Sequence, residues 1–239
     1  MTGLEFFAKI YAPNTPLVVL DVGAHVGDSV ASFLSIFPQS KIHAFEPAPD
    51  NFSRLQDLYQ NHAQVDLHAK AVGAKSGFTQ LHLNNYDATH SVLPINPKEI
   101  NRWADTADIS EASQLKVEQC SIDTFFHETS LEKIDILKLD VQGGELAALE
   151  GALKTLQSQK IGCLFVEVEF RQLYAGQPLA WDIHSFLAAQ DYHFINFIYP
   201  NTTEAGLLSW ADAIYVNSEI WDRLADGHSA GKLTASLSS

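Results

Sequence analysis

The sequence predicts an α/β protein with a Rossmann-like architecture, in which a mostly parallel central sheet carries helices on both faces and ends in an antiparallel C-terminal strand pair. Three observations support this fold class. Short apolar runs typical of buried parallel strands alternate with helix-like segments over most of the chain. A loop with two glycines joins the first apolar run to the helix that follows it. The last two runs are separated only by turn-rich sequence, so they are expected to pair antiparallel.

The composition is that of an ordinary globular protein. The chain has 239 residues, enough for one large domain, and 46% of them are hydrophobic, enough for a sizeable core. The formal net charge of −14 argues against nucleic acid as a partner, because phosphate binding depends on Lys and Arg. No apolar run approaches the roughly 20 residues of a membrane helix, and the N-terminus does not resemble a signal peptide, so we expect no membrane partner. The sequence leaves the oligomeric state open.

Two cysteines, Cys120 and Cys163, lie in apolar, strand-like contexts. Their spacing indicates neither a zinc site nor a disulfide framework. Buried free thiols fit a reducing compartment, so we expect a cytoplasmic protein.

In the first half of the chain, strands alternate with helices. Residues 1–11 place apolar side chains at helical spacing, and two prolines end that helix. The elements that follow are strands at 17–22, 41–47 and 65–73 and helices at 29–36 and 50–62. The order strand, helix, strand, helix, strand predicts a doubly wound parallel sheet.

The middle of the chain is less regular. Residues 76–85 alternate apolar and polar side chains and are expected to form an added strand. The polar segment 84–114, interrupted by Pro94 and Pro97, is expected to be an insertion with a functional role. Residues 116–126 predict a further strand that leads into a short helix.

The second half returns to the alternating order. Its expected elements are strands at 133–141 and 161–170, helices at 142–158 and 180–190, and closing strands at 192–200 and 212–218. The predicted organisation is an N-terminal helical extension over 1–14, one domain over 15–223 and a disordered tail over 224–239. The tail is assigned as disordered because its residues are small and polar.

The loop after the first strand, VLDVGAHVGD, carries the most specific chemistry. Gly23 and Gly27 allow backbone N–H groups to approach a ligand closely. Their spacing is G-x-x-x-G, whereas dinucleotide-binding loops have G-x-G-x-x-G, and bulky His25 stands between the two glycines. Asp21 and Asp28 would repel a pyrophosphate, so the loop favours a ligand with a positive end and no phosphate. S-adenosylmethionine is such a ligand, and we count both acids among its expected contacts.

Glu46 ends the second predicted strand, about 20 residues after the glycine loop. An acid at this distance, at the tip of the neighbouring strand, accepts hydrogen bonds from ribose hydroxyls. The sequence therefore predicts that Glu46 binds the ribose of a nucleoside cofactor.

Three blocks, VLDVGAHVGD, HAFEPAPDNF and IDILKLDVQGGELAALEGA, together resemble the FkbM-type family of S-adenosylmethionine-dependent methyltransferases. The likeness extends over residues 17–217. It implies a seven-stranded class I methyltransferase fold and O-methylation, commonly of a hydroxyl on a saccharide or natural-product small molecule. The cofactor contacts implied by the resemblance are Asp21, Gly23, Ala24 and Gly27 at the methionine end, Glu46 at the ribose, Pro47 and Asn51 near the adenosine, and Ala71 and Val72 beside the adenine.

One position departs from the family pattern, which usually has Glu where this chain has Gln142. The amide keeps the shape of the carboxylate but loses its charge. If that carboxylate binds a metal or a basic group in relatives, the role is weakened here.

Asp140 lies at the C-terminal end of a predicted core strand, the edge at which open α/β sheets bind ligands. We expect it to contact the reacting centre or the ammonium group of the cofactor, with an N-cap of the next helix as the structural alternative. Methyl transfer requires donor and acceptor in line, and a hydroxyl acceptor benefits from a general base. His90 is a candidate base because it lies in the insertion over the site, and Ser91 and Tyr86 are candidate contacts to acceptor or cofactor.

The carboxylates near this strand edge leave a second arrangement open. Asp140, Glu145 and Glu167 could together hold a hard cation of the Mg²⁺ type. Pairing with a nearby base or contact with acceptor hydroxyls is favoured over that site, and we predict no metal ligand. Glu145 has a structural alternative as well, because an acid in the first turn of a helix stabilises it.

The predicted function is S-adenosylmethionine-dependent O-methylation of a small-molecule or saccharide acceptor. Two other functions stay open. An NAD-dependent oxidoreductase on a Rossmann-type sheet would need a loop compatible with phosphate, which the acids of this loop oppose. A non-catalytic binding protein with a methyltransferase fold is the second alternative, because Gln142 departs from the family pattern.

Overall fold

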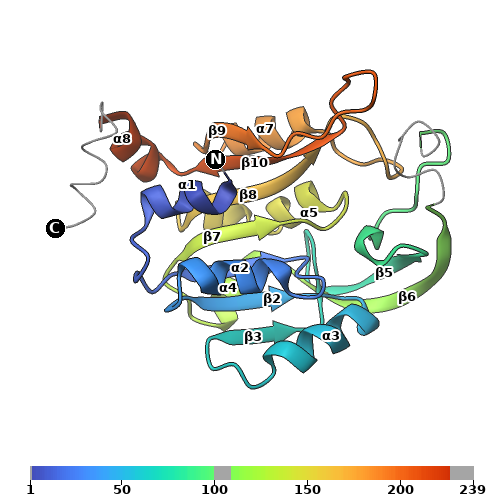
Figure 1. The fold of residues 1–239 in the computed structure, drawn as a ribbon, viewed down its shortest axis with the longest axis horizontal. Helices are drawn as coiled ribbons and strands as arrows, with labels where there is room; N and C mark the ends of the chain where they lie inside the picture. Colours follow the sequence, from blue (N-terminus) through green and yellow to red (C-terminus); the bar gives the residue numbers. More distant parts are fainter. Residues whose placement is uncertain (1, 100–108, 227–239) are drawn as a thin grey trace.

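The computed structural model describes residues 2–99 and 109–226. The middle layer of the structure is a seven-stranded sheet with the strand order β3-β2-β1-β7-β8-β10-β9 (Figure 1). The strands are β1 (Val18–Val22), β2 (Lys41–Phe45), β3 (Val65–His68), β7 (Ile134–Leu139), β8 (Ile161–Glu169), β9 (His193–Ile198) and β10 (Trp210–Val216). The strands from β3 to β8 pair in parallel, and β10 pairs antiparallel with both β8 and β9. The predicted fold class is confirmed, including the antiparallel C-terminal pair.

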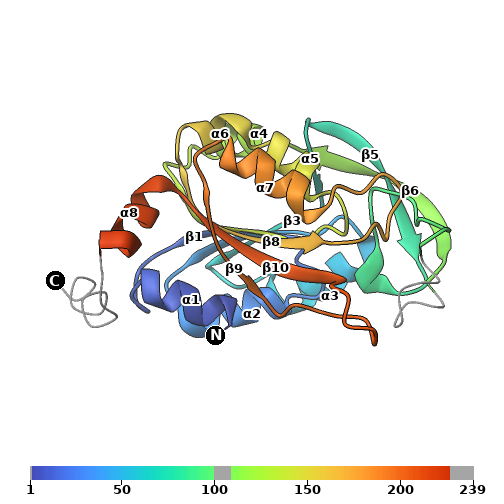
Figure 2. The same cartoon turned by 90° about the horizontal axis from the view of Figure 1, so that it is seen from above.

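Helices cover both faces of this sheet, as Figure 2 shows from above. One face carries α1 (Gly3–Ile10), α2 (Asp28–Ile36) and α3 (Pro49–Tyr59), and the other carries α4 (Ile122–Glu128), α5 (Glu145–Glu150), α6 (Leu153–Gln157) and α7 (Ala180–Ala188), with α8 (Ser218–Asp226) after β10. Successive side chains of a strand point to opposite faces, so each face has its own core. Val19 packs with Phe7 and Phe33 on the first face, and Leu20 packs with Leu149 on the second.

A second sheet of three strands stands beyond the carboxyl ends of the parallel strands (Figure 1). It has the order β4-β6-β5 and consists of β4 (Ala71–Val72), β5 (Gly77–Asn84) and β6 (Glu111–Cys120). The expectation of one strand over 65–73 is therefore wrong, because β3 belongs to the main sheet and β4 to the small one. The chain turns between them, where the Lys70 N–H donates to the carbonyl of His68.

The predicted helix over 142–158 is also two elements, α5 and α6. Gly151 separates them, and a side chain at this position would overlap the backbone carbonyl of Gly73, just after β4. Asp123 of α4 accepts hydrogen bonds from the Lys154 and Thr155 N–H groups, which satisfies the first turn of α6. The break in the helix thus lets the small sheet approach the second helical layer closely.

The described part of the insertion packs against the rest of the molecule. It contains the 3₁₀ turn η1 (Asp87–Thr89), and bridges link His82 with Ser91 and Ile95 with Tyr174. Its last residues belong to β6, which begins at Glu111 rather than after residue 114. Residues 100–108 of the insertion lie outside the described residues.

Helices α1 and α8 can be compared with the predicted domain boundaries. Phe7 of α1 is fully buried, so the helical extension over 1–14 packs on the main core. Helix α8 continues to Asp226, across the expected boundary at 223, and residues 227–239 of the expected tail lie outside the described residues. The division into 1–14, 15–223 and 224–239 stays a prediction.

Both cysteines are free and buried, as predicted. Burial raises the pKa of Cys120 to about 11 and that of Cys163 to about 12. Within residues 2–99 and 109–226, no helix has the length and apolar character needed to cross a bilayer.

Candidate active site

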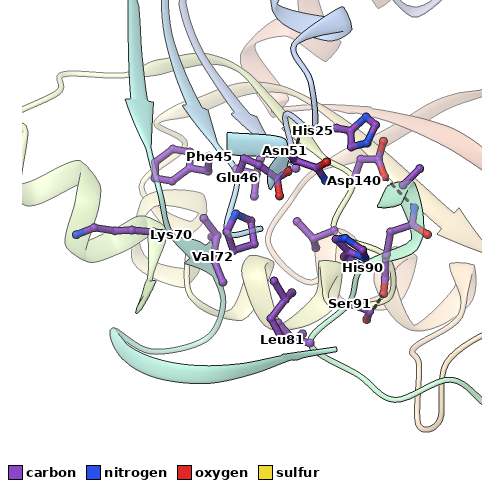
Figure 3. A pocket seen from close by; sticks show the side chains of 18 of the residues that line it. His25, Phe45, Glu46, Asn51, Lys70, Val72, Leu81, His90, Ser91 and Asp140 are labelled. Atoms are coloured by element: carbon purple, nitrogen blue, oxygen red, sulfur yellow. Dashed lines mark hydrogen bonds between the residues drawn. The ribbon is translucent and has the colours of Figure 1, made fainter. Parts of the chain in front are cut away.

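A cleft of about 260 Å³ opens where β1, β2, β7 and β8 end. The carboxyl edge of an open parallel sheet is where such folds bind ligands. The loops after these strands form one side of the cleft, and β4, β5 and residues 87–92 of the insertion form the other. Figure 3 shows Phe45 and Lys70 at one end of the cleft and Asp140 and Ser91 at the other.

The two glycines of the first loop bring structural elements close together. Gly23 has φ +81°, and a side chain there would overlap the carbonyl oxygen of Asp140, so this glycine lets the loops after β1 and β7 touch. Gly27 has φ +97° at the start of α2, where a side chain would meet Tyr59 and Leu55 of α3. Both positions need a residue that tolerates a left-handed backbone.

Glu46 projects into the cleft from the tip of β2. Its carboxylate oxygens accept hydrogen bonds from the backbone N–H groups of Ala48 at 2.9 Å and His25 at 3.0 Å. Burial raises the pKa of Glu46 to about 7, against the opposing effect of these two N–H groups. A carboxylate fixed in this way keeps lone pairs free for hydroxyl groups of a ligand.

One end of the cleft is apolar. Phe45, Val72 and Leu81 line it from β2, β4 and β5. Lys70 at the same end is engaged by Glu118, with 2.7 Å between its ammonium and a carboxylate oxygen. Such walls suit a flat, uncharged ring.

Asn51 adds a polar atom without a partner. Its side chain is 2% exposed and lines the cleft, and its Oδ1 accepts no hydrogen bond from any described residue. The amide nitrogen is 3.5 Å from the carbonyl oxygen of Asp87. A buried acceptor left unpaired is costly, so this oxygen points to a donor on a bound ligand.

The other end is acidic. Because β7 and β8 pair in register, Asp140 and Glu167 project side by side from neighbouring strands. The amide nitrogen of Gln142 donates to both, at 3.1 Å to Asp140 Oδ1 and 2.7 Å to Glu167 Oε2. The Lys138 ammonium lies 3.3 Å from Asp140 Oδ2 and 3.5 Å from Asp21 Oδ1.

These contacts shift the pKa values of Asp140 and Glu167 in opposite directions. Burial acts to raise the pKa of Asp140, but Lys138 and Gln142 outweigh it and hold that pKa below its usual range. Burial and the neighbouring Asp140 carboxylate raise the pKa of Glu167 well above its usual range. Asp140 is therefore the member of the pair that ionises first, and Glu167 is the member that holds a proton more readily.

Three more carboxyls surround the pair. Burial raises the pKa of Glu145 to about 7, of Glu169 to about 9 and of Asp212 to about 6. Glu145 closes the loop before α5 by accepting hydrogen bonds from the Val141 and Gly143 N–H groups, which supports its structural reading. In the described part of the chain, no group of three or more His, Cys, Asp or Glu is arranged to hold a metal ion.

His90 lines the cleft, but its contacts do not favour a general base. The backbone N–H of Asn84 donates to His90 Nδ1 at 3.0 Å. A neutral ring with Nδ1 as acceptor carries its proton on Nε2, so no lone pair is left to take another. Burial lowers the pKa of His90, which favours this neutral form. The ring can instead donate a hydrogen bond to a ligand.

The structure brings most of the predicted site residues together. Those that line the cleft are Gly23, Glu46, Pro47, Asn51, Ala71, Val72, His90 and Asp140, together with Ser91. Those that do not line it, among the described residues, are Asp21, Ala24, Gly27, Asp28 and Tyr86.

Asp21 is the main difference from the expectation. Its side chain is fully buried among β1, α2 and β7, where it accepts a hydrogen bond from Ser29 Oγ and faces Lys138. It therefore shares no cleft with Glu46, and its contacts orient Lys138 toward Asp140. Asp28 is an exposed residue in the first turn of α2, where a carboxylate stabilises the helix.

Two residues that contact the site, Phe45 and Tyr174, were not identified from the sequence. Phe45 directly precedes Glu46, so its place at a strand tip was a usable signal. Tyr174 gives no local signal, because it reaches the site from the loop after β8. Its buried hydroxyl lies 3.0 Å from Gln142 Oε1 and 2.9 Å from the Thr89 carbonyl oxygen, so its one hydrogen is shared between two acceptors.

The site has more carboxyl groups than cations. Among the described residues that line the cleft, the one ammonium, that of Lys70, is paired with Glu118, and Lys138 behind the cleft is paired with Asp140. A cation at the acidic end and an uncharged ring at the apolar end therefore fit the lining, whereas a pyrophosphate would meet like charge.

A model of the methyltransferase FkbM domain family matches residues 21–194. Over 165 residues the chain is 26% identical to the 2-O-methyltransferase NoeI of Sinorhizobium fredii, a match that covers 67% of this chain and 66% of the relative. Over 159 residues it is 31% identical to the methyltransferase sdnD of Sordaria araneosa, covering 58% and 61%. The chain thus spans less than two thirds of the length of either relative.

Solved structures give a more distant likeness. The magnesium protoporphyrin IX methyltransferase of Synechocystis PCC 6803, crystallised with bound S-adenosylmethionine, is 13% identical. The match covers 90% of this chain and 74% of that chain, with a TM-score of 0.49. A likeness of this degree assigns no function.

Proposed function

Because the chain belongs to the FkbM methyltransferase domain family, we propose that it transfers a methyl group from S-adenosylmethionine to a hydroxyl of a saccharide or natural-product small molecule. The observation that carries this proposal is the lining of the cleft, which has an acidic end, an apolar end and the fixed Glu46 carboxylate. The name of the relative NoeI, a 2-O-methyltransferase, supports a hydroxyl as acceptor.

The residues of the cleft fit the parts of this cofactor. Glu46 would accept hydrogen bonds from the two ribose hydroxyls, and Asn51 Oδ1 would accept one from the adenine amino group. Phe45, Val72 and Leu81 would enclose the adenine ring. Asp140 would face the ammonium and sulfonium charges, which the ionised carboxylate stabilises.

The cofactor supplies an activated methyl group, so the protein mainly has to orient the acceptor. Holding two reactants in line can lower a barrier by roughly 7–11 kcal/mol. The insertion residues His90 and Ser91 line the cleft near its acidic end and would contact the acceptor. Asp140 is the ionised group closest to the proposed methionine end, and it would receive the hydroxyl proton.

Two other functions are less well supported. An NAD-dependent oxidoreductase would place a pyrophosphate beside Glu46 and Asp140, where like charges repel. A binding protein without activity would have the same cleft, so only a product distinguishes it. We also propose a cytoplasmic location, which the two free buried thiols support.

Calorimetric titration tests the cofactor. Heat with S-adenosylhomocysteine and none with NAD is the expected result, and heat with NAD alone would reverse the proposal. Mass spectrometry then tests methyl transfer to a panel of methyl glycosides of glucose, galactose and mannose and to simple phenols and alcohols. Binding of S-adenosylhomocysteine without a methylated product across this panel would favour the binding protein.

A further inference from the structure

We propose that Gln142 is a positioning residue that aims both hydrogens of its amide at Asp140 and Glu167, and that the pair held in this way takes the proton of the acceptor hydroxyl. The inference rests on the proposed methyl transfer and names the group that serves it. All three side chains line the cleft, and the amide nitrogen lies 3.1 Å from Asp140 Oδ1 and 2.7 Å from Glu167 Oε2.

The Gln142 amide has as many N–H donors as the pair has carboxyl groups, and both carboxyls lie within hydrogen-bond distance. A primary amide has two N–H donors, and each carboxyl takes one of them. A carboxylate in the same place would have no donor and would add a like charge to the cluster. Gln142 thus provides two hydrogen bonds without a charge, which leaves Lys138 as the one cation in contact with the pair among the described residues.

The orientation of the amide is fixed from its other side. The Tyr174 hydroxyl is 3.0 Å from Gln142 Oε1 and donates toward it, so the oxygen faces Tyr174 and the nitrogen faces the carboxyls. Tyr174 itself is fully buried, and its hydroxyl also reaches the carbonyl of Thr89 in the insertion at 2.9 Å. A flipped amide would turn its oxygen toward the ionised Asp140 carboxylate and take both N–H donors away from the pair, which would be unfavourable.

The backbone of Gln142 is held as firmly as its side chain. The residue has φ +56°, a left-handed conformation that is uncommon outside glycine, and the surroundings maintain it. Ser91 Oγ donates to its carbonyl oxygen at 2.6 Å, and the Leu93 N–H donates to Ser91 Oγ at 2.9 Å. The insertion and the loop after β8 therefore hold one residue in place, and the polar contacts of its side chain with other described residues are with the pair and Tyr174.

The chemical step balances with this pair. A bond forms between the acceptor oxygen and the methyl carbon, and the bond from that carbon to the sulfonium sulfur breaks. The hydroxyl proton passes to the Asp140 carboxylate, which Gln142 and Lys138 hold by hydrogen bonds. The proton leaves to solvent through the open cleft after the product departs.

Other charged or titratable groups also face the pair from every element packed on it. They are Lys138 on β7, Asp21 on β1, Glu169 on β8, Asp212 on β10, Glu145 on α5, Glu46 at the tip of β2 and Tyr174 in the loop after β8. Apart from Tyr174 in its own variant, they are the same in the variants below, so a change in the titration of the pair reports the residue that was substituted.

The first variant is Gln142→Glu, which keeps the shape and adds a carboxylate in contact with both members. Its negative charge favours protonation of the pair, so the base form appears only at higher pH. We expect the acid limb of the kcat–pH profile to move up by about one unit or more. Because the pKa of Asp140 starts below its usual range, kcat should fall by about tenfold on the acid limb of the profile, while the Kd of S-adenosylhomocysteine and the KM of the acceptor change by less than about threefold.

The second variant is Tyr174→Phe, with Tyr192→Phe as its matched control. Both tyrosines are buried, and both donate to a backbone carbonyl, but the Tyr192 hydroxyl reaches Ile161 at the opposite edge of the sheet. The two variants should lose similar stability, and only Tyr174→Phe should shift the acid limb of the profile upward. Equal profiles for both would overturn the role of Tyr174 in fixing the amide.

A titration that needs no acceptor separates this inference from the proposed function. Carbon-13 NMR of Asp and Glu carboxyls, in the protein saturated with S-adenosylhomocysteine, should show a wide separation between the two steps of the pair and higher values in Gln142→Glu. Unchanged carboxyl titration in that variant, or an unchanged kcat–pH profile with an acceptor from the panel, would overturn the inference while methyl transfer stands. Absence of any methylated product in the wild-type protein would instead count against the proposed function and the proton step together, and the titration would still decide the role of Gln142.

Discussion

At the scale of single residues, Glu46 shows how a strand tip becomes a ligand contact. Two backbone N–H groups orient its carboxylate, and burial raises its pKa to about 7. A ligand that donates hydroxyl hydrogens to this carboxylate binds its ionised form better than its protonated form. Cofactor affinity should therefore depend on pH near neutrality.

We expect the affinity for S-adenosylhomocysteine to be constant above pH 7.5 and to weaken as Glu46 takes up a proton below about pH 7. Glu46→Gln should bind roughly 10–100-fold more weakly at pH 8 and lose most of this pH dependence, because two hydrogen bonds to a charged group are weakened. Glu150→Gln, at an exposed residue of α5, is the control. Calorimetry between pH 6 and pH 8.5 measures both quantities, and an equal pH dependence in Glu46→Gln would remove the ribose assignment.

Asp140 is the second test at this scale. Asp140→Asn keeps the acceptor for Gln142 but removes the negative charge, so turnover should fall by roughly 10²–10⁴-fold. Rates with an acceptor from the panel measure the effect. Wild-type turnover in this variant would exclude Asp140 as the proton acceptor.

The sequence was informative about Glu46 and Asp140 because each directly follows an apolar run, and a strand tip on a parallel sheet is a ligand position. It was less informative about Asp21, which lies within β1, one residue before the end of the strand. Its side chain shares the face of Val19 and therefore points among the helices rather than over the edge of the sheet. The bridge through Gln142 depends on Tyr174, 32 residues away, and no local pattern announces it.

At the scale of elements, the alternation of apolar runs and helix patterns was enough to predict the main sheet. The split of β3 from β4 and of α5 from α6 was not, because both depend on one long-range contact. Gly151 between the helices packs on the carbonyl of Gly73, next to β4, which lines the cleft. The hydrophobic periodicity of a segment describes that helix or strand alone. It does not show which distant residues the segment contacts.

Gly151→Ala tests that contact. The added methyl group should force α5 and β4 apart, destabilise the protein by about 1–3 kcal/mol and weaken binding of S-adenosylhomocysteine. Gly206→Ala is the control, since its left-handed backbone is strained by a side chain but the space around it is open. Thermal unfolding and calorimetry compare the two, and equal cofactor affinity in both variants would show that the contact does not shape the cleft.

At the scale of the whole molecule, the number of buried carboxyls sets the pH dependence of stability. Burial raises the pKa of Glu46 and Glu145 to about 7 and that of Glu169 to about 9, well above the values near 4.5 in an unfolded chain. Between these limits the folded protein holds more protons than the unfolded one, so the free energy of unfolding falls as pH rises. Burial lowers the pKa of His68 to about 4. Between about pH 4 and pH 6.5 this residue therefore makes the free energy of unfolding rise with pH.

We therefore expect the Tm of the protein without cofactor to be highest at about pH 5, because above it the three carboxyls outweigh His68, and to fall by several degrees toward pH 8.5. Calorimetry at matched ionic strength measures the trend. Glu145→Gln should flatten it, because the amide keeps an oxygen for the Val141 and Gly143 N–H groups but cannot ionise. A Tm that rises over the same range would mean that these carboxyls are already ionised in the folded protein.

The two buried thiols described with the fold have a practical consequence. Cys163 is fully buried and Cys120 is 8% exposed, so we expect both to react slowly with a thiol reagent in the native state and faster when the core opens. Labelling kinetics with a chromogenic disulfide would thus report the opening rate of the wild-type chain at β6 and β8, without any engineered dye. Slower labelling in the presence of a candidate small molecule would then identify compounds that occupy the protein, before any reaction product is known.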